Sequence, residues 1–247
     1  KLRFGYEIVD PWSQEVHYLV AEDAILNLQN NTSSFIRSQD KTGLTSEIGQ
    51  DLLYDLRDNR LDPTDGYFFK IGSDVAGLGG TTKFARGRFD MGAYLPLGGE
   101  WTLSNTGELG IIESFNKKPI RINQRLFLGG DNLRGFATGG VSPRDQITGD
   151  ALGGTWFAAG TTELSFPLGL PKEFGILGKL FTDYGTIGAT DISNTAFQDK
   201  ASIRASLGFG LGWRSPFGPV RIDYAKAFLK EDFDKTESIR ISFGTRF

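Results

Sequence analysis

Three charged side chains of this sequence have the types and the spacing to form an ion-paired site. Arg134 lies in the glycine-rich stretch LGGDNLRGF, and Glu163 and Asp183 lie in two later segments, TTELSFPLG and LFTDYGTIG. One arginine can bind two carboxylates, because its planar guanidinium group carries five N–H donors in a fixed arrangement. A carboxylate that is removed from water needs such a partner. The three residues therefore predict an ion pair that holds a loop against two neighbouring segments.

The two acidic residues face the same way if their segments are β-strands. Side chains alternate between the two faces of a strand, so Glu163 lies opposite Leu164 and Phe166. Asp183 in the same way lies opposite Tyr184. The two segments follow each other along the chain and are therefore expected to be neighbours in a sheet. An arginine among glycines is equally consistent with an exposed, solvated loop residue, and the stretch around it does not by itself decide between the two.

Alternation of apolar and polar residues extends over most of the chain. It is clearest in residues 202–213, where Ile203, Leu207 and Phe209 fall on one face and arginine, serine and glycine fall on the other. The same period recurs in four further segments, 67–75, 85–95, 220–224 and 239–247. Such strands run to about 10–14 residues, whereas the strands of globular proteins are most often ~5–6 residues long. The chain is therefore predicted to be all-β, with long antiparallel strands.

The predicted strands fit a transmembrane barrel better than a soluble β-sandwich. Their second face is charged or glycine-rich, as in a barrel whose apolar residues face lipid and whose polar residues line a wet lumen. Aromatic residues also gather near the strand ends, where a barrel meets the two membrane surfaces. They are Tyr67, Phe68, Trp101, Trp156, Phe157, Trp213, Phe217 and Phe247. The alternative is a soluble, lipocalin-like binding protein, which would be obtained without detergent.

We predict about eleven strands, whereas a bacterial barrel normally has an even number. Their expected ranges are 2–9, 16–28, 45–58, 66–78, 81–97, 99–115, 155–168, 176–188, 201–214, 218–229 and 237–247. Of the long connections at 29–44 and 116–154, the second exceeds a simple turn and is a candidate functional loop directed into the lumen. Because the count is odd and the chain begins inside a strand, we expect residues 1–247 to be the C-terminal part of a barrel domain whose first strands lie outside this chain.

Composition argues against several other functions. The 247 residues include no cysteine and one histidine, His17, which removes cysteine-based metal sites and most zinc or catalytic-triad chemistry. We interpret His17 as an ordinary strand residue. A net charge of −3 argues against nucleic-acid binding. The acidic stretch KEDFDKTE at 230–237 is expected to be a solvated turn rather than a cation site. We therefore expect no enzymatic activity, no metal and no cofactor.

Six stretches of the sequence carry a family likeness. They are LFLGGDNLRGF, GDALGG, TTELSFPLGLP, LFTDYGTIG, WRSPFGPVRIDYA and SIRISFGTRF. Together they resemble the C-terminal barrel of BamA, a family of outer-membrane protein assembly factors. The likeness covers most of the chain and is strongest from Asn123 to Phe247. The sequence around GLP and DNRLDPTDGY is most similar to the alphaproteobacterial members of the family. The resemblance implies an antiparallel barrel of about sixteen strands.

The resemblance also implies roles for individual residues. In this family an Arg-Gly-Phe loop enters the barrel lumen, and Arg134, Gly135 and Phe136 match that triplet. Glu163 and Asp183 match the acidic residues of the barrel wall that receive the arginine. The family likeness thus favours the buried arginine over the solvated one.

The last strand carries the remaining implied residues. Gly244 matches the glycine that kinks the last strand of the family, and Phe247 matches the terminal aromatic residue that marks outer-membrane strands for recognition. The first and last strands of the family meet at a weak seam, through which client strands are thought to pass. Glycine inside a strand loosens it and permits a bend, although crowding in the lumen would also select glycine at this position.

We therefore expect an insertase of the bacterial outer membrane, which folds and inserts other β-barrel proteins without covalent chemistry. The implied partners are unfolded outer-membrane protein precursors, lipoprotein subunits of the BAM complex, and lipid. The periplasmic POTRA domains of the family would precede the present chain. The alternative hypothesis is a two-partner secretion pore, which also carries an Arg-Gly-Phe loop, or a passive porin. The number of POTRA repeats upstream distinguishes these hypotheses.

Overall fold

The computed structural model describes residues 1–39, 42–189, 191–192, 196–215 and 218–244 and consists mainly of β-strands. Eleven strands form one antiparallel sheet in the order β1-β2-β3-β4-β5-β6-β9-β10-β12-β13-β15. Each long strand therefore pairs with the next long strand along the chain. The prediction of an all-β, antiparallel fold with this number of strands is confirmed.

Nine strands of the sheet have 11–15 residues, enough to cross a membrane. They are β2 (Trp12–Ala24), β3 (Thr42–Asp55), β4 (Gly66–Ala76), β5 (Phe84–Gly98), β6 (Trp101–Ser114), β9 (Trp156–Pro167), β10 (Ile176–Gly188), β12 (Arg204–Ser215) and β13 (Gly218–Leu229). The two strands at the ends of the sheet, β1 (Leu2–Val9) and β15 (Ile239–Phe243), are shorter. The short elements are α1 (Ser34–Arg37), η1 (Ile122–Gln124), β7 (Gly135–Phe136), β8 (Arg144–Asp145), η2 (Lys172–Phe174), β11 (Phe197–Gln198) and β14 (Thr236–Glu237). Within the described ranges, none of the helices has the length and apolar character needed to cross a membrane.

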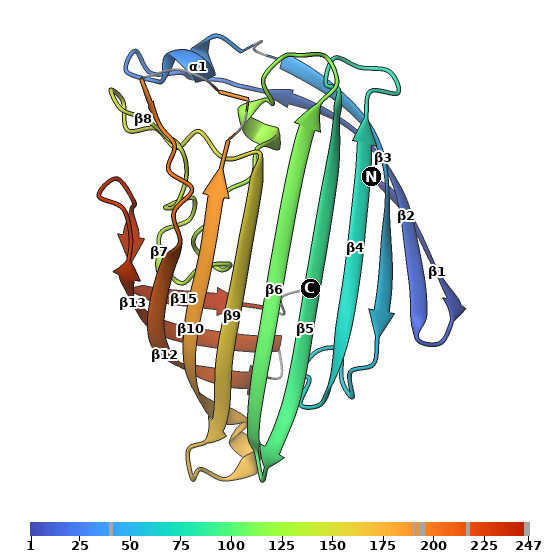
Figure 1. Cartoon of the computed structure of the whole chain (residues 1–247). Helices are drawn as coiled ribbons and strands as arrows, with labels where there is room; N and C mark the ends of the chain where they lie inside the picture. The colour runs from blue at the N-terminus through green and yellow to red at the C-terminus, as the bar shows by residue number, and fades with distance from the viewer. Residues whose placement is uncertain (40–41, 190, 193–195, 216–217, 245–247) are drawn as a thin grey trace.

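The sheet is curled, with short turns at one end and long loops at the other (Figure 1). The loop between β6 and β9 does not stay at the rim, because it runs along the inner side of the sheet beside β10, β12 and β13. Two small ladders involve this loop, since β7 pairs with β14 and β8 pairs with β11. The loop is therefore joined to later parts of the chain as well as to the wall.

The two faces of the sheet have opposite polarity. On the outer face, Ile71, Ile111 and Leu207 are each more than half exposed. On the inner face, Arg204 and Ser206 of β12 are buried. A soluble protein would cover so much apolar surface, whereas lipid covers it in a membrane barrel. The alternation predicted for residues 202–213 is confirmed by this arrangement.

A buried apolar cluster lies between the loop and the inner face of the sheet. It contains Leu128, Leu133, Phe136, Val141 and Ile187. The first four belong to the loop, and the fifth belongs to β10. Burying a side chain of this size contributes about 1.5–3 kcal/mol. The loop therefore has a packed core of its own, and this core places its charged residues against the wall.

The second strand differs most from its predicted range. We expected a strand at 16–28, and β2 spans Trp12–Ala24. The sequence pattern is misleading here, because Leu26 and Leu28 continue the alternation although they lie beyond the strand and are exposed. The predicted ranges left residues 10–15 between the first two strands, whereas β1 and β2 are joined by a two-residue turn. The apolar pattern therefore does not mark the end of this strand.

Candidate loop-anchoring site

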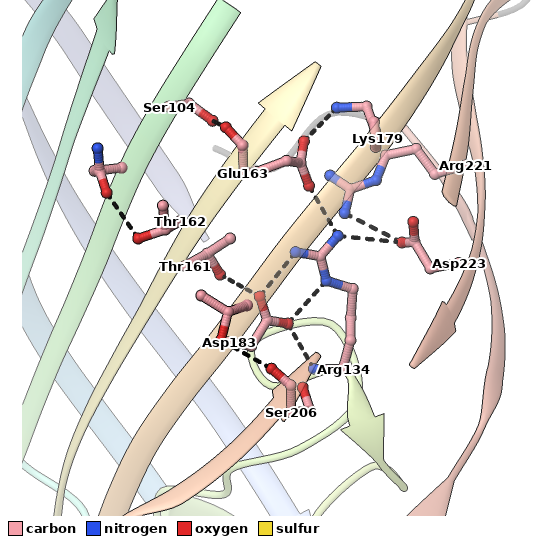
Figure 2. Close-up of polar contacts among 12 residues, drawn as sticks. Ser104, Arg134, Thr161, Thr162, Glu163, Lys179, Asp183, Ser206, Arg221 and Asp223 are labelled. Atoms are coloured by element: carbon pink, nitrogen blue, oxygen red, sulfur yellow. Dashed lines mark hydrogen bonds and ion pairs between the residues drawn. The ribbon is translucent and has the colours of Figure 1, made fainter. Parts of the chain in front are cut away.

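Strands β9 and β10 place Glu163 and Asp183 on the inner face of the sheet. In the antiparallel register Glu163 pairs with Phe181. Asp183 pairs with Thr161. The two carboxylates therefore lie on adjacent strands, two residues apart along the strand direction. Figure 2 shows the side chain of Arg134 pointing from the loop toward both of them.

Arg134 donates four hydrogen bonds to these carboxylates. Its Nε and Nη2 atoms lie 2.8 Å from Oδ2 and Oδ1 of Asp183, which is the two-point contact that arginine favours. Its Nη1 atom lies 2.9 Å from Oε2 of Glu163, and its backbone N–H donates to Asp183 Oδ2 at 2.9 Å. The side chain of Arg134 is 1% exposed and that of Asp183 is 0% exposed. The arginine is thus not a solvated loop residue in this structure.

Three further charged residues extend the network. Lys179 donates to Glu163 from the other side, and Asp223 Oδ2 lies 3.5 Å from Arg134 Nη1. Arg221 Nη2 lies 3.4 Å from the same oxygen of Asp223. The cations Arg134, Lys179 and Arg221 thus balance the anions Glu163, Asp183 and Asp223 (Figure 2). Balance matters because a buried ion without a partner is strongly destabilising.

Asp223 and Thr161 are parts of the network that the sequence pattern does not reveal. Asp223 alternates with the apolar residues Ile222 and Tyr224, so the sequence does place it on the inner face. Alternation does not show how close β13 lies to the loop. Thr161 Oγ1 donates to Asp183 Oδ1 at 2.9 Å. A threonine in a strand carries no signal for such a contact, because threonine is common in strands.

The guanidinium group also lies over an aromatic ring. Cζ of Arg134 is 3.2 Å from the centroid of the ring of Phe181, which is buried on β10. A cation so close to the face of a ring is attracted by its π electrons. The ring therefore supports the guanidinium plane from one side while the carboxylates bind its edge.

Gly135 and Phe136 hold the loop close to the wall. Gly135 has a φ of +89°, and a Cβ atom there would come within 2.8 Å of Cβ of Ser206. Both the positive φ and the close approach to Ser206 therefore require glycine. Phe136 is fully buried in the loop core. Both residues also pair with β14 in an antiparallel ladder. The triplet thus combines an ion pair, a close backbone approach and an apolar contact.

The loop is also tied to the connection that carries α1. Ser33, which caps α1, donates from its hydroxyl to Asp145 at 2.6 Å and from its backbone N–H to Asp150 at 2.7 Å. Burial alone would raise the pKa of Asp145, but hydrogen bonds from Ser33 and from the N–H groups of Ile147 and Thr148 hold that pKa below its ordinary value. Asp145 therefore stays ionised and connects the two long loops.

Gly244 lies apart from the hydrogen-bonded network. It follows β15 with a φ of +94°, and its N–H donates to the carbonyl of Pro219 at 2.9 Å. A Cβ atom at this position would have nothing within 4 Å, so crowding in the lumen does not explain the glycine, whereas the positive φ does. The kink that the family likeness assigns to Gly244 stays a prediction. Phe247 lies outside the described residues.

A cavity of about 490 Å³ lies between the network and the short turns. Glu163, Lys179 and Arg221 line it from the network, and Gly244 lines it from the end of the last strand. Residues of the turn at 60–64 contribute to the rest of its wall. The loop-anchoring network and the end of the last strand therefore border the same internal space.

A second group of charged residues lines the inner face of β2, β3, β4 and β5. His17 Nε2 lies 3.1 Å from Asp74 Oδ1 and 3.9 Å from Glu47 Oε1, and the three side chains hold potential metal ligands within 4.8 Å of one another. Arg86 binds the remaining oxygens, at 2.5 Å from Glu47 and 3.0 Å from Asp74. Arg88 Nη2 lies 3.2 Å from Asp74 Oδ2, so two guanidinium groups stand beside the two carboxylates and this group does not require a metal ion. His17 is therefore a buried strand residue of β2 whose ring contacts two carboxylates of a charge network.

The acidic stretch at 230–237 is only partly solvated, contrary to expectation. Asp234 is buried and its Oδ2 lies 3.0 Å from Arg204 Nε. Glu231 Oε2 accepts from Lys200 at 2.8 Å. These contacts join the connection after β13 to the beginning of β12. The sequence did not reveal them, because the basic partners Lys200 and Arg204 lie about 30 residues earlier, just before β12 and at its first residue.

These features define the class of protein. The outer face of the sheet is apolar, the inner face carries paired charges, and a loop is held inside by a buried arginine. This combination describes the wall of a transmembrane β-barrel with a loop in its lumen.

The chain belongs to the Omp85 superfamily, because the Omp85 superfamily domain matches residues 1–247. The outer membrane protein assembly factor BamA of Neorickettsia risticii is 31% identical over 244 residues, which cover 98% of this chain and 33% of that protein. The sorting and assembly machinery component 50 homolog of Mus musculus is 29% identical over 184 residues, which cover 72% of this chain and 39% of that protein. The resemblance to the BamA barrel stated from the sequence is confirmed.

A solved structure has the same fold. The crystal structure of BamA from Haemophilus ducreyi lacking POTRA domains 1–3 matches with a TM-score of 0.83 and 22% identity, over 97% of this chain and 52% of that one. At this identity the similarity shows the fold alone. The chain spans 33% and 39% of the length of the two curated relatives named above.

Proposed function

We propose that this chain is the barrel wall of an assembly factor that folds and inserts other β-barrel proteins into the bacterial outer membrane. The observation that carries the proposal is the placement of the loop, which is fixed to β9 and β10 and also bound to the strands at the end of the sheet. A loop in the lumen is by itself compatible with a pore as well, because loops also plug or narrow pore barrels. Contacts of the same loop with the segment before the last strand and with the last strand itself favour a protein that holds a strand edge in place. The relatives named as assembly factors support the same function.

The first part of the mechanism is the anchor. Arg134 holds the loop 116–154 against the wall through Glu163 and Asp183. Gly135 allows the close approach to β12, and Phe136 adds the apolar contact. The anchored loop keeps the lumen in a shape in which the edge of the last strand can be used.

The second part is a weak seam at the last strand. β15 is five residues long and pairs with Val220–Tyr224 of β13, whereas β12 and β13 are 12 residues long. An unpaired strand edge is a template to which an incoming strand can add by backbone hydrogen bonds. Gly244 is the point at which the last strand bends, and Phe247 is its terminal aromatic recognition residue. Client strands add at this seam before they leave for the lipid.

The activity uses no cofactor and forms no covalent bond. Its partners are unfolded outer-membrane protein precursors, the lipoprotein subunits of the BAM complex and the surrounding lipid, and they do not include nucleic acid. The barrel itself lies in the outer membrane, where its apolar outer face meets lipid.

The experiment compares client assembly by full-length variants in liposomes. Arg134→Ala is expected to slow the folding of an added client barrel by about tenfold or more, since each ~1.4 kcal/mol of lost anchoring corresponds to a factor of ten. Arg134→Lys keeps the charge but loses the two-point contact, so its rate of client folding should lie between the rates of the wild type and of Arg134→Ala. A normal rate for Arg134→Ala would contradict the anchor. Export of a soluble substrate without any client assembly by the wild type would instead favour the two-partner secretion pore.

A further inference from the structure

The anchored loop also binds the segment that leads into the last strand. In addition to the β7–β14 ladder, the N–H of Ala137 donates to the carbonyl of Lys235 at 2.9 Å, and the N–H of Lys235 donates to the carbonyl of Gly140 at 3.0 Å. These bonds lie immediately before β15. The loop that Arg134 fixes to β10 therefore reaches the end of the sheet.

Two polar side chains of β15 face this loop. Asp131 Oδ1 accepts a hydrogen bond from Ser242 Oγ at 2.8 Å and lies 3.5 Å from Arg240 Nη1. Arg240 Nη2 also donates to Thr138 Oγ1 at 3.2 Å and to Glu237 Oε2 at 2.6 Å. The side chains on the inner face of the last strand are thus bound by the loop that carries the anchoring arginine.

Two glycines bring the Asp131 carboxylate to the strand. Gly130 has a φ of +77°, and a Cβ atom there would lie 3.1 Å from Arg240 Nη2. Gly129 has a φ of +118°, and a Cβ atom there would lie 2.3 Å from the carbonyl oxygen of Ala137. A side chain at either position would be strained or would collide. The turn before Asp131 therefore depends on glycine to reach β15.

The hydrogen-bonded ladder with β13 restrains β15 within the plane of the sheet only. Its five residues pair edge to edge with β13, and its apolar side chains Ile239, Ile241 and Phe243 are exposed on the outer face. A short two-stranded contact of this kind is weak by itself. The contacts of Asp131 add a restraint on the inner side, perpendicular to the ladder.

We infer that Asp131 is a positioning residue that sets the place of the last strand relative to the anchored loop. The inference rests on the proposed assembly function, because the place of β15 matters to assembly only if its edge receives a client strand. The loop then acts as a strut across β12 and β13. Arg134 fixes one part of the strut to β10, and Asp131 fixes another part to β15.

Hydrogen–deuterium exchange of the full-length protein in lipid nanodiscs tests the inference. Asp131→Ala is expected to raise the exchange rate of the amides of Ile239–Phe243 by about three- to fivefold, the size expected for a partly exposed ion pair and hydrogen bond. Exchange at β7 and the melting temperature should stay at their wild-type values. Asp131→Glu keeps the carboxylate and should restore most of the protection. Asp150→Asn is the matched control, because Asp150 lies on the same loop but binds Ser33.

Client assembly is measured on the same samples. Unchanged exchange of Ile239–Phe243 in Asp131→Ala, or an equal rise in Asp150→Asn, overturns the inference. Faster exchange in Asp131→Ala with a normal rate of client assembly also overturns it, because the contact would then hold the strand without serving assembly. A normal rate of client assembly by Arg134→Ala would instead overturn the proposed function, and the exchange result would stand separately.

Discussion

Two charged networks line the inner face of the same sheet, and they differ in where the cation comes from. In the network of β2–β5, Arg86 binds Glu47 and Asp74, and Asp74 and Arg86 are paired directly across β4 and β5. In the network of β9–β13, Arg134 comes from the loop and binds Asp183. Neighbouring strands are already joined by backbone hydrogen bonds, so the first network reinforces an existing contact. The second network creates a contact that the backbone does not make.

Both networks depend on glycine in the strands. A Cβ atom on Gly49 would lie 2.1 Å from Oδ1 of Asp74, and one on Gly210 would lie 2.1 Å from Oδ1 of Asp223. Each glycine leaves room for a charged side chain to lie flat across a neighbouring strand. The glycine-rich polar face seen in the sequence thus reflects the packing of carboxylates and guanidinium groups on the inner wall.

Among variants of the two networks, Asp183→Ala is expected to lose the most free energy of unfolding. Asp183 accepts hydrogen bonds from Arg134 and from Thr161, so its loss leaves a buried guanidinium without its main partner. Removing one partner of a buried ion pair costs about 3–5 kcal/mol. We expect a loss of this size in the free energy of unfolding, measured by urea titration in detergent, and faster proteolysis of the loop 116–154.

A double variant checks the cause of that loss. Asp183→Ala combined with Arg134→Ala removes both partners, so it should be less destabilised than the sum of the two single variants. Strictly additive losses would show that the two side chains stabilise the protein independently.

Asp74→Asn tests the network that involves only the wall, and its expected effect is smaller. Arg86 keeps its contact with Glu47, and Arg88 keeps its contact with Asp51. The lost hydrogen bonds to a charged group correspond to about 1.5–3 kcal/mol in the free energy of unfolding, measured by the same titration. Proteolysis of the loop should stay at the wild-type rate. Faster loop cleavage in Asp74→Asn would show that the two networks are coupled.

Acidification should produce the smallest effect, through the tie between Asp145 and Ser33. The pKa of Asp145 is lowered in the folded protein, so its contribution is fully present above the unfolded pKa of about 3.9 and is lost as the pH falls through the folded value. The difference in melting temperature between wild type and Asp145→Asn should therefore be present at about pH 5 and should vanish once the pH lies below the folded pKa. A difference that is already absent at about pH 5 would contradict this tie.

Much of the fold could be predicted because lipid and a wet lumen demand opposite side chains on alternate positions. The predicted ranges 176–188 and 218–229 coincide with β10 and β13. Predictions fail where the alternation continues past the strand, as it does after Ala24. They also fail where a residue of a connection pairs with a residue of a strand, as in the contact between Asp234 and Arg204 of β12.

Less of the candidate site could be predicted. Alternation places Glu163 and Asp183 on one face, and charge together with the family likeness names Arg134 as their partner. The contributions of Asp223 and Asp131 could not be foreseen in this way. Asp223 joins the site because the sheet curls and brings β13 to the loop, and Asp131 contacts β15 because two glycines turn the loop toward it.

The residue pattern alone assigned which side chains face lipid and which face the lumen, because the two-residue period of a strand places every side chain on one face. It also determined that a glycine-rich loop carries an arginine for which acidic partners exist on the inner face. The three-dimensional structure was needed to show that Asp223 also meets that arginine, that Asp131 reaches the last strand, and that His17 contacts the carboxylates of a second charge network. Those contacts depend on how the sheet curls and where the loop packs, and neither is encoded in the spacing of residues along a single strand.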